Sequence, residues 1–246
     1  MKQLILKVWE NDRIAESVYR MVLEGPELEE QKPGQFVNIR LDGQFLRRPI
    51  SVCESEAGML TIIYKVIGRG TEALSRRRRR DTLDVLTGLG NGYDLSKAGD
   101  RPLLLGGGVG VPPLVMLARK LREQGKDVTA VLGFNTKEEV FGETAFRMMD
   151  CKAIVTTVDG SYGMKGFVTD ALPENYSYFY TCGPEPMLKA VYRKTLTSGQ
   201  FSFEERMGCG FGACMGCSCR TITGYKRICR EGPVLEKEEI LWAERI

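Results

Sequence analysis

The chain contains no histidine among its 246 residues. This absence excludes a histidine general base, a Ser-His-Asp triad, zinc bound through imidazole and a Rieske-type iron–sulfur centre. A basic surface for nucleic acid is also missing, because the formal net charge is only +3 and no basic stripe is interleaved with aromatic residues. Any redox or transfer chemistry must therefore depend on other side chains or on cofactors.

Long apolar runs are absent as well. Residues 1–20 carry charges throughout and lack the apolar stretch of a signal peptide. The longest uncharged run, residues 102–118, contains four glycines and three prolines, which indicates a strand, a turn and a helix start rather than a membrane span. We therefore expect a cytoplasmic protein. In that reducing compartment its eight cysteines are more often metal ligands than disulfides.

The first hundred residues show the pattern of short β-strands. Alternating runs separated by turn signals lie at residues 4–8, 19–23, 36–39 and 60–64. Several short strands at this spacing predict a small antiparallel β-barrel over residues 1–99.

The pattern changes near residue 101. Buried-strand signals at 103–105, 128–134, 153–158 and 177–181 alternate with expected helices at 113–123, 138–149 and 186–197. This alternation predicts a central α/β parallel-sheet domain over residues 100–202. Residues 203–246, which are dense in cysteine and glycine, form the third and smallest unit of a multi-domain chain.

The cysteine spacing is the sharpest motif. It reads C-x4-C-x2-C with a fourth cysteine after eleven further residues, which is the plant-type pattern for a [2Fe–2S] cluster. Thiolate sulfur is a suitable ligand because it is soft and anionic. The predicted ligands are Cys209, Cys214, Cys217 and Cys229. Cys219 lies outside the pattern. A four-cysteine zinc site is the competing interpretation, although such sites usually show two short cysteine pairs.

Two further motifs leave alternatives open. The glycine turn at residues 106–110 follows a strand and precedes a helix, which suits a phosphate but equally suits tight strand–helix packing. Cys182, Gly183 and Pro184 end another strand, where the thiol could pack against a nicotinamide or could simply be buried.

Two arginine-containing segments are equally ambiguous. Residues 47–52 could place a guanidinium and a hydroxyl around a flavin pyrophosphate, or form an ordinary strand with surface arginines. The run Arg76–Arg80 is predicted to be a solvated helix end or loop on the barrel.

The order of these motifs is more specific than any one of them. A barrel with Arg48-Pro49-Ile50-Ser51, a strand–glycine–helix unit, Thr181-Cys182-Gly183-Pro184 and a four-cysteine loop together resemble the ferredoxin reductase-like flavoprotein superfamily. Within it, the chain resembles the electron-transfer subunits of type B, NAD-dependent dihydroorotate dehydrogenases over essentially its whole length.

The resemblance implies an FAD-binding barrel, an NAD(H)-binding α/β domain and a [2Fe–2S] cluster domain. The residues implied at the FAD site are Arg48, Pro49, Ile50, Ser51, Ile63, Tyr64, Lys65, Gly70 and Thr71. Those implied near the dinucleotide are Gly106, Gly107, Gly108, Val109, Gly110, Gly183 and Pro184, with Cys182 as the catalytic residue against the nicotinamide. The cluster would face a partner subunit that contains FMN, in a heterotetramer of pyrimidine biosynthesis.

Three rival functions remain at this point. The chain could serve another oxidoreductase complex (sulfide, sulfite, hydrogenase or electron-bifurcating), act as a stand-alone ferredoxin-type reductase, or be a zinc-stabilised nucleotide-binding regulator without a redox role. NADH rather than NADPH is implied only by the resemblance, because Asn135-Thr136-Lys137 offers neither an acidic ribose clamp nor an arginine for a 2′-phosphate.

Overall fold

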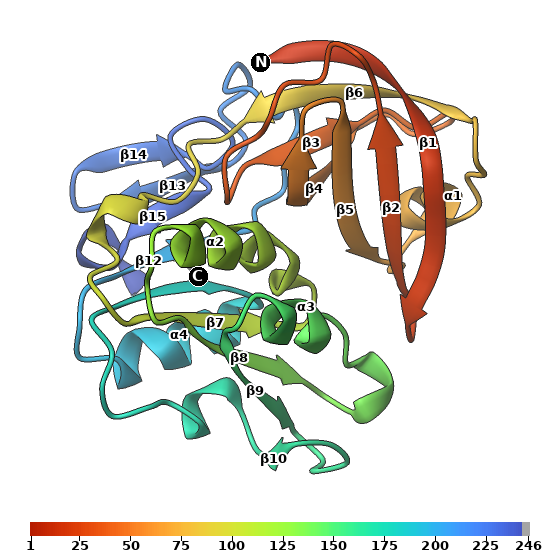
Figure 1. Cartoon of the computed structure of the whole chain (residues 1–246). Helices are drawn as coiled ribbons and strands as arrows, with labels where there is room; N and C mark the ends of the chain where they lie inside the picture. The colour runs from red at the N-terminus through yellow and green to blue at the C-terminus, as the bar shows by residue number, and fades with distance from the viewer. Residues whose placement is uncertain (243–246) are drawn as a thin grey trace.

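Six antiparallel strands close into a barrel in the computed structural model, which describes residues 1–242 (Figure 1). The strands are β1 (Lys2–Ala15), β2 (Val18–Glu24), β3 (Phe36–Ile39), β4 (Arg48–Glu56), β5 (Met59–Lys65) and β6 (Thr82–Leu89), in the order β1-β2-β5-β4-β3-β6. Side chains alternate between the two faces of each strand, so Leu4, Leu6 and Val8 of β1 fill the interior while Ile5 points outward. The predicted barrel is confirmed.

The arginine run lies on the surface of this barrel. Helix α1 (Arg69–Ser75) seats Leu74 in the barrel core and ends as the run begins. Arg77 pairs with Asp42 at 3.1 Å, and the Arg79 guanidinium lies over the Trp9 ring. The segment is therefore a helix end and turn, as the sequence predicts.

A seven-stranded sheet forms the second layer of the molecule. Its strands are β7 (Pro102–Gly107), β8 (Thr129–Phe134), β9 (Lys152–Thr157), β10 (Met164–Lys165), β11 (Tyr178–Cys182), β12 (Gly199–Ser202) and β15 (Val234–Glu236). The order is β10-β9-β8-β7-β11-β12-β15, and all neighbours run parallel except the antiparallel pair β12 and β15. The order reverses between β7 and β11, which is where ligands bind in sheets of this kind.

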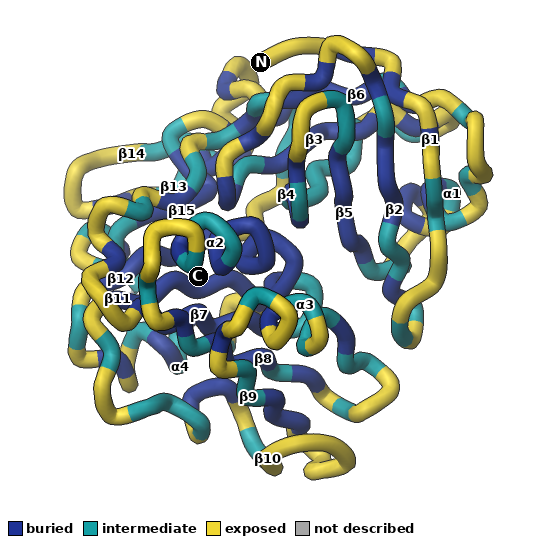
Figure 2. The backbone as a smooth tube through the Cα atoms, in the orientation of Figure 1, coloured by how far each residue is buried: buried dark blue, intermediate teal, exposed yellow. Residues whose placement is uncertain are grey.

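Helices cover both faces of the sheet. α2 (Pro112–Glu123) and α3 (Glu143–Met148) share a core with Leu104, whereas α4 (Glu185–Lys194) shares one with Leu103 and Leu105. α2 also packs on β4 and places Met116 in the barrel core. Because it is enclosed by the sheet and the barrel, α2 is buried along most of its length (Figure 2).

Two predicted helices differ from the structure. Residues 138–149 are not one helix: the 3-10 turn η3 (Lys137–Glu139) and α3 are separated by Phe141, which packs on Phe134, and by Gly142 at φ +83°. The helix predicted at 186–197 ends at Lys194, because Thr195 is extended and its carbonyl accepts a hydrogen bond from Lys237. Long-range contacts override the local helical pattern at both places.

The last segment is tied to the sheet rather than separate from it. It contains the hairpin β13 (Ser218–Thr221) and β14 (Gly224–Arg227), the strand β15 and the 3-10 turn η5 (Lys237–Glu239). Three more 3-10 turns lie earlier in the chain: η1 (Leu95–Lys97), η2 (Gly108–Gly110) and η4 (Val168–Asp170). The domain limits 1–99, 100–202 and 203–246 stay predictions, and residues 243–246 lie outside the described part. No helix within residues 1–242 is long and apolar enough to span a membrane.

Candidate functional site

A cavity of about 610 Å³ opens beyond the carboxyl ends of β7, β8 and β11. We call it the sheet cavity. Residues of the two turns that the sequence singles out line it: Gly107, Gly108, Val109, Gly110, Gly183 and Pro184. The cavity therefore occupies the topological switch point, where an α/β sheet binds a nucleotide.

The glycine turn has a packing role at two of its positions. Gly106 does not line the cavity, and a Cβ there would lie 2.9 Å from Val111, so this glycine permits strand–helix packing. A Cβ on Gly110 would lie 2.3 Å from the Cys182 carbonyl oxygen. Gly110 is thus required for the two cavity-forming turns to approach one another.

The start of α2 is a poorer anion site than the sequence suggests. Prolines at residues 112 and 113 supply no N–H, and the N–H groups of Val111 and Leu114 donate to the carbonyls of Gly108 and Val111. The helix start therefore has few free donors, and a phosphate would have to depend on the turn at residues 108–110.

A second cavity of about 370 Å³, the barrel cavity, lies against β4, β5 and α1. The structure brings all nine residues implied for the flavin site to its wall, namely Arg48, Pro49, Ile50, Ser51, Ile63, Tyr64, Lys65, Gly70 and Thr71. Cys182 lines the same cavity from the end of β11. The barrel and the sheet therefore build this wall together.

Arg48 and its neighbour Arg47 have different environments. A Cβ on Gly70 would lie 2.3 Å from Arg48 Nε, so only glycine allows the Arg48 side chain to pass there. Arg48 donates to Gln44 Oε1 at 2.7 Å. Arg47 instead donates to both carboxylate oxygens of Asp84 at 3.0 Å. Arg48 thus belongs to the cavity, and Arg47 stabilises the barrel.

Three residues line both cavities: Lys65, Val109 and Glu204. Lys65 forms a 2.7 Å ion pair with Glu139, which lines the sheet cavity. Burial opposes ionisation of Glu139, but the bonds from Lys65 and Asn135 hold its pKa below the usual range. Burial raises the pKa of Glu204, whose exposed surface faces the two cavities.

Sequence reasoning missed both of these carboxylates. Glu139 follows the end of β8, and an acidic residue soon after a strand of a nucleotide-binding sheet is a usable signal. Glu204 stands in an irregular segment without a motif, so no local pattern could have identified it.

Cys182 is neutral in this environment. The side chain is almost completely buried, and burial raises the pKa of its thiol to about 12, with the nearby charge of Glu204 acting in the same direction. A thiol in this state is not a nucleophile or a base at neutral pH. Its contribution is therefore a compact apolar surface at the cavity wall.

The four predicted cluster cysteines lie in one loop region and its neighbouring turn. Cys209 Sγ accepts hydrogen bonds from the N–H groups of Ala213 (3.2 Å) and Cys214 (3.5 Å). Burial opposes ionisation, but these N–H donors lower the pKa of Cys209 to about 6. Cys217 Sγ accepts a bond from the Cys229 N–H at 3.4 Å, and both of these thiols are buried.

The thiols are arranged as two pairs. Cys209 interacts with Cys214, and Cys217 interacts with Cys229, while Cys209 influences Cys229 only through its charge. Within residues 1–242, no three His, Cys, Asp or Glu side chains converge around a position for a single metal ion. Four thiols that associate as two pairs supply the donor set that a cluster of two irons takes. Cys219 lies on β13, opposite Lys226 of β14.

The barrel, the doubly covered sheet and the cavity between them define a reductase of the ferredoxin reductase-like class. A solved NADH-dependent reduced ferredoxin-NADP oxidoreductase, described for flavin-based electron bifurcation, is 33% identical with a TM-score of 0.87, and the match covers 97% of this chain and 90% of the other. An Amycolatopsis cytochrome P450 reductase, at 23% identity and a TM-score of 0.71 over 78% of this chain and 65% of that one, shares the fold.

Sequence comparison identifies the family within this class. The chain is 45% identical to the "Dihydroorotate dehydrogenase B (NAD(+)), electron transfer subunit" of Geobacillus sp. (strain WCH70) over 98% of this chain and 99% of the relative. It is 44% identical to the protein of the same description from Fusobacterium nucleatum, over 92% and 94%. Residues 204–241 match the family described as the iron–sulfur cluster binding domain of dihydroorotate dehydrogenase B. The chain belongs to the family of electron-transfer subunits of dihydroorotate dehydrogenase B, which are flavin and iron–sulfur oxidoreductase components.

Proposed function

We propose that this chain passes electrons between NAD(H) and the FMN of a dihydroorotate dehydrogenase catalytic subunit, through FAD in the barrel cavity and a [2Fe–2S] cluster on Cys209, Cys214, Cys217 and Cys229. The continuity of the sites is the main support. The two cavities share a wall, and Met207, which lines the barrel cavity, stands two residues before Cys209.

The sheet cavity is the proposed NAD(H) site. Its volume falls within the range of ordinary ligand cavities, about 300–1,000 Å³. The nicotinamide end would reach the wall that Val109 and Glu204 share with the barrel cavity. FAD in the barrel cavity would supply a hydride acceptor, which takes up two electrons with one proton, and a [2Fe–2S] cluster on the four cysteines would supply one-electron transfer.

The protein's part in this reaction is positioning. Gly110 allows the turns after β7 and β11 to meet without a side chain between them, and the neutral Cys182 thiol provides an apolar wall. Arg48 supplies a cation at the rim of the barrel cavity, where a pyrophosphate could accept its hydrogen bonds. Hydride and electron transfer between cofactors needs no general base from the protein, which agrees with the absence of histidine.

The proposed partner is the FMN-containing catalytic subunit, in a cytoplasmic heterotetramer of pyrimidine biosynthesis. Apolar side chains near the cysteines support a protein contact there, because Phe211, Met215, Ile222 and Tyr225 are all exposed. Exposed apolar residues beside a cluster suit a surface through which electrons leave the chain.

A second candidate is a reductase subunit of another complex. The oxidoreductase structure at 33% identity covers nearly the whole chain, so the fold alone does not distinguish the partners. The higher identity to dihydroorotate dehydrogenase B subunits and the presence of all four cysteines favour the orotate system.

The test is to purify the chain together with its co-expressed partner, record the visible spectrum, and measure NADH-dependent orotate reduction with and without that partner. We expect flavin and iron–sulfur bands, and orotate reduction only in the complex. Absence of both kinds of band would overturn the proposal. Intact bands without orotate reduction would overturn the orotate assignment and favour the second candidate.

A further inference from the structure

Asn38 is a buried polar residue on the face of β3 that points away from the barrel interior. Val37 and Ile39 enter the barrel core, so Phe36 and Asn38 occupy the opposite face. Phe36 lines the barrel cavity and also shares a hydrophobic cluster with Cys217 and Cys229. This face of β3 is therefore the platform on which the cysteine region sits.

Asn38 connects this platform to the first predicted cluster ligand. Its Nδ2 donates to the Cys209 carbonyl oxygen at 3.3 Å. On the neighbouring strand, Pro49 of the barrel cavity wall lies directly opposite Asn38. The side chain that contacts the cysteine loop thus comes from the strand position next to Pro49, a residue of the proposed flavin site.

The cysteine loop is shaped to receive this side chain. Gly210 has φ +81°, a conformation that glycine adopts readily, and a Cβ there would lie 2.3 Å from Asn38 Nδ2. The loop therefore approaches β3 as closely as a backbone without a side chain allows. The close approach and the hydrogen bond act at adjacent residues, Cys209 and Gly210.

Burying the Asn38 amide at this position costs folding free energy. Asn38 is 1% exposed, and its Oδ1 has no hydrogen-bond partner among residues 1–242. A buried amide with an unpaired acceptor is unfavourable, and an apolar side chain would fill the same space without that cost. Reversing the amide would place Oδ1 against the Cys209 carbonyl, two acceptors together, so only the observed orientation makes a bond.

We propose that Asn38 is a positioning residue that fixes the Cys209 loop against the flavin barrel, and so holds the cluster in its working place and environment. This inference rests on the proposed function. The Cys209 thiolate depends on N–H donors from the same loop, at Ala213 and Cys214. A loop released from β3 would shift these donors relative to the sulfur, which changes both the stability and the electronic surroundings of a cluster.

The test compares Asn38→Leu with Thr87→Val, both in the full complex with the partner subunit. Thr87 is also buried in the barrel, but its hydroxyl donates to the Lys2 carbonyl on β1. Measurements are the electron paramagnetic resonance spectrum of the reduced cluster, the rate of iron loss to a chelator, and the rate of flavin reduction by NADH. For Asn38→Leu we expect a changed spectrum and iron loss about tenfold faster, with flavin reduction within about twofold of the parent. Thr87→Val should match the parent in all three.

A milder variant, Asn38→Ser, keeps a shorter donor and covers the case in which Asn38→Leu does not fold. We expect it to lie between the parent and Asn38→Leu in iron loss. A spectrum and an iron-loss rate equal to the parent's in the folded variants would overturn the positioning role and leave the proposed function intact. A parent complex without iron–sulfur bands would overturn the proposed function, and the role of Asn38 with it.

Discussion

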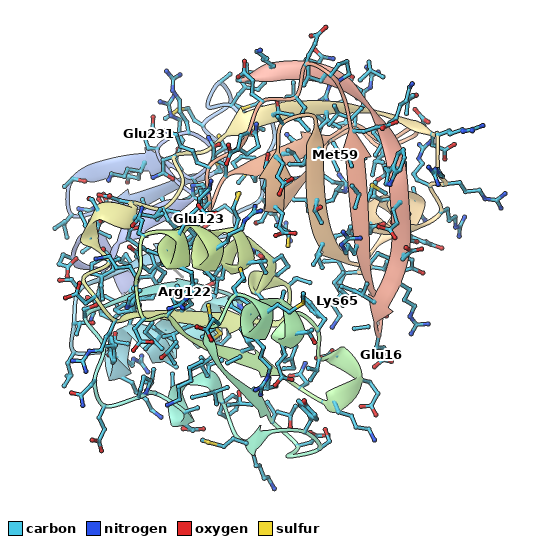
Figure 3. The ribbon with its side chains drawn as sticks, viewed as in Figure 1. Glu16, Met59, Lys65, Arg122, Glu123 and Glu231 are labelled. Atoms are coloured by element: carbon cyan, nitrogen blue, oxygen red, sulfur yellow. The ribbon has the colours of Figure 1, made fainter. Side chains whose placement is uncertain are left out.

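Lys65 and Glu139 form a 2.7 Å ion pair that joins the end of barrel strand β5 to the turn after sheet strand β8. A backbone hydrogen bond from Glu16 N–H to the Glu138 carbonyl, 2.9 Å long, accompanies it. Figure 3 shows Lys65 and Glu16 at the end of the barrel that faces this turn. The contact holds the barrel and the sheet together beside both cavities, since Lys65 lines both of them.

The first prediction concerns the choice between NADH and NADPH. Glu139 is ionised at neutral pH because its pKa is lowered, and its carboxylate lines the sheet cavity, where it repels an additional phosphate. Glu139→Gln should raise kcat/KM for NADPH relative to NADH by about tenfold, equivalent to roughly 1.4 kcal/mol. The control is Glu138→Gln, an exposed neighbour outside the cavity lining. An unchanged ratio in Glu139→Gln would remove Glu139 from cofactor selection.

The second prediction concerns the glycine turn. Gly110→Ala places a methyl group against the Cys182 backbone, which cannot move without disturbing β11. We expect a loss of about 2–3 kcal/mol in the free energy of unfolding and much weaker NADH binding. Gly125→Ala is the comparison, because Gly125 has φ +76° but no atom within 4 Å of the added methyl. Gly125→Ala should lower the free energy of unfolding by about 1 kcal/mol and leave NADH binding unchanged. Denaturant titration and NADH titration measure the two effects.

The third prediction separates ligand cysteines from the additional one. Cys217→Ser should reduce bound iron and sulfide by at least about tenfold while the flavin is retained, because the cluster loses a thiolate. Cys219→Ser should keep both, since Cys219 lies on β13 opposite Lys226 and outside the C-x4-C-x2-C…C spacing. Iron, sulfide and flavin are determined on the same preparation. Iron loss in Cys219→Ser equal to that in Cys217→Ser would show that the ligand set is misassigned.

The fourth prediction concerns pH and barrel stability. Burial opposes ionisation of Asp84, but the two bonds from Arg47 lower its pKa below the usual range. Because the folded-state pKa is lowered, the stabilisation is present above the unfolded-state value of about 3.9 and is lost as the pH falls through the folded-state value. Asp84→Asn should lower the free energy of unfolding by about 1–2 kcal/mol at pH 7. This difference from the parent should shrink as the pH falls.

The matched control for this pair is Asp42→Asn. Asp42 also bonds an arginine, Arg77, but its side chain is 95% exposed, so the pair contributes little. Thermal unfolding of the parent and both variants between pH 7 and pH 3 makes the comparison. A difference between Asp84→Asn and the parent that stays constant with pH would mean that the ion pair is not its source.

Much of this architecture was predictable from local pattern. Period-two alternation identified the barrel strands, since one face of each strand is buried, and the uninterrupted apolar run at residues 103–105 identified the central strand β7, which is covered on both faces. Cysteine spacing predicted the thiol loop because ligand geometry restricts the number of residues between ligands.

What the sequence did not reveal depends on long-range contacts. Val234–Glu236 is too short to predict as a strand, and it becomes one only through pairing with β12. The break between η3 and α3 follows from Phe141 packing on Phe134, which no helical periodicity encodes. Glu204 joins the two cavities only because the chain after β12 passes between them. Sequence reasoning also overlooked that paired prolines remove donors from the start of α2.

The antiparallel strand β15, which follows the cysteine loop, forms the outer edge of the sheet and covers β12. It covers the open side of β12 with main-chain hydrogen bonds. A shortened diaphorase ending at residue 202 would present β12 as a bare edge, whose unpaired N–H and C=O groups are a template for intermolecular strand pairing. Single cysteine substitutions would therefore remove the proposed cluster and leave β12 covered, whereas deleting residues 203–246 would turn the sheet of the proposed NAD(H) site into an aggregation-prone fragment.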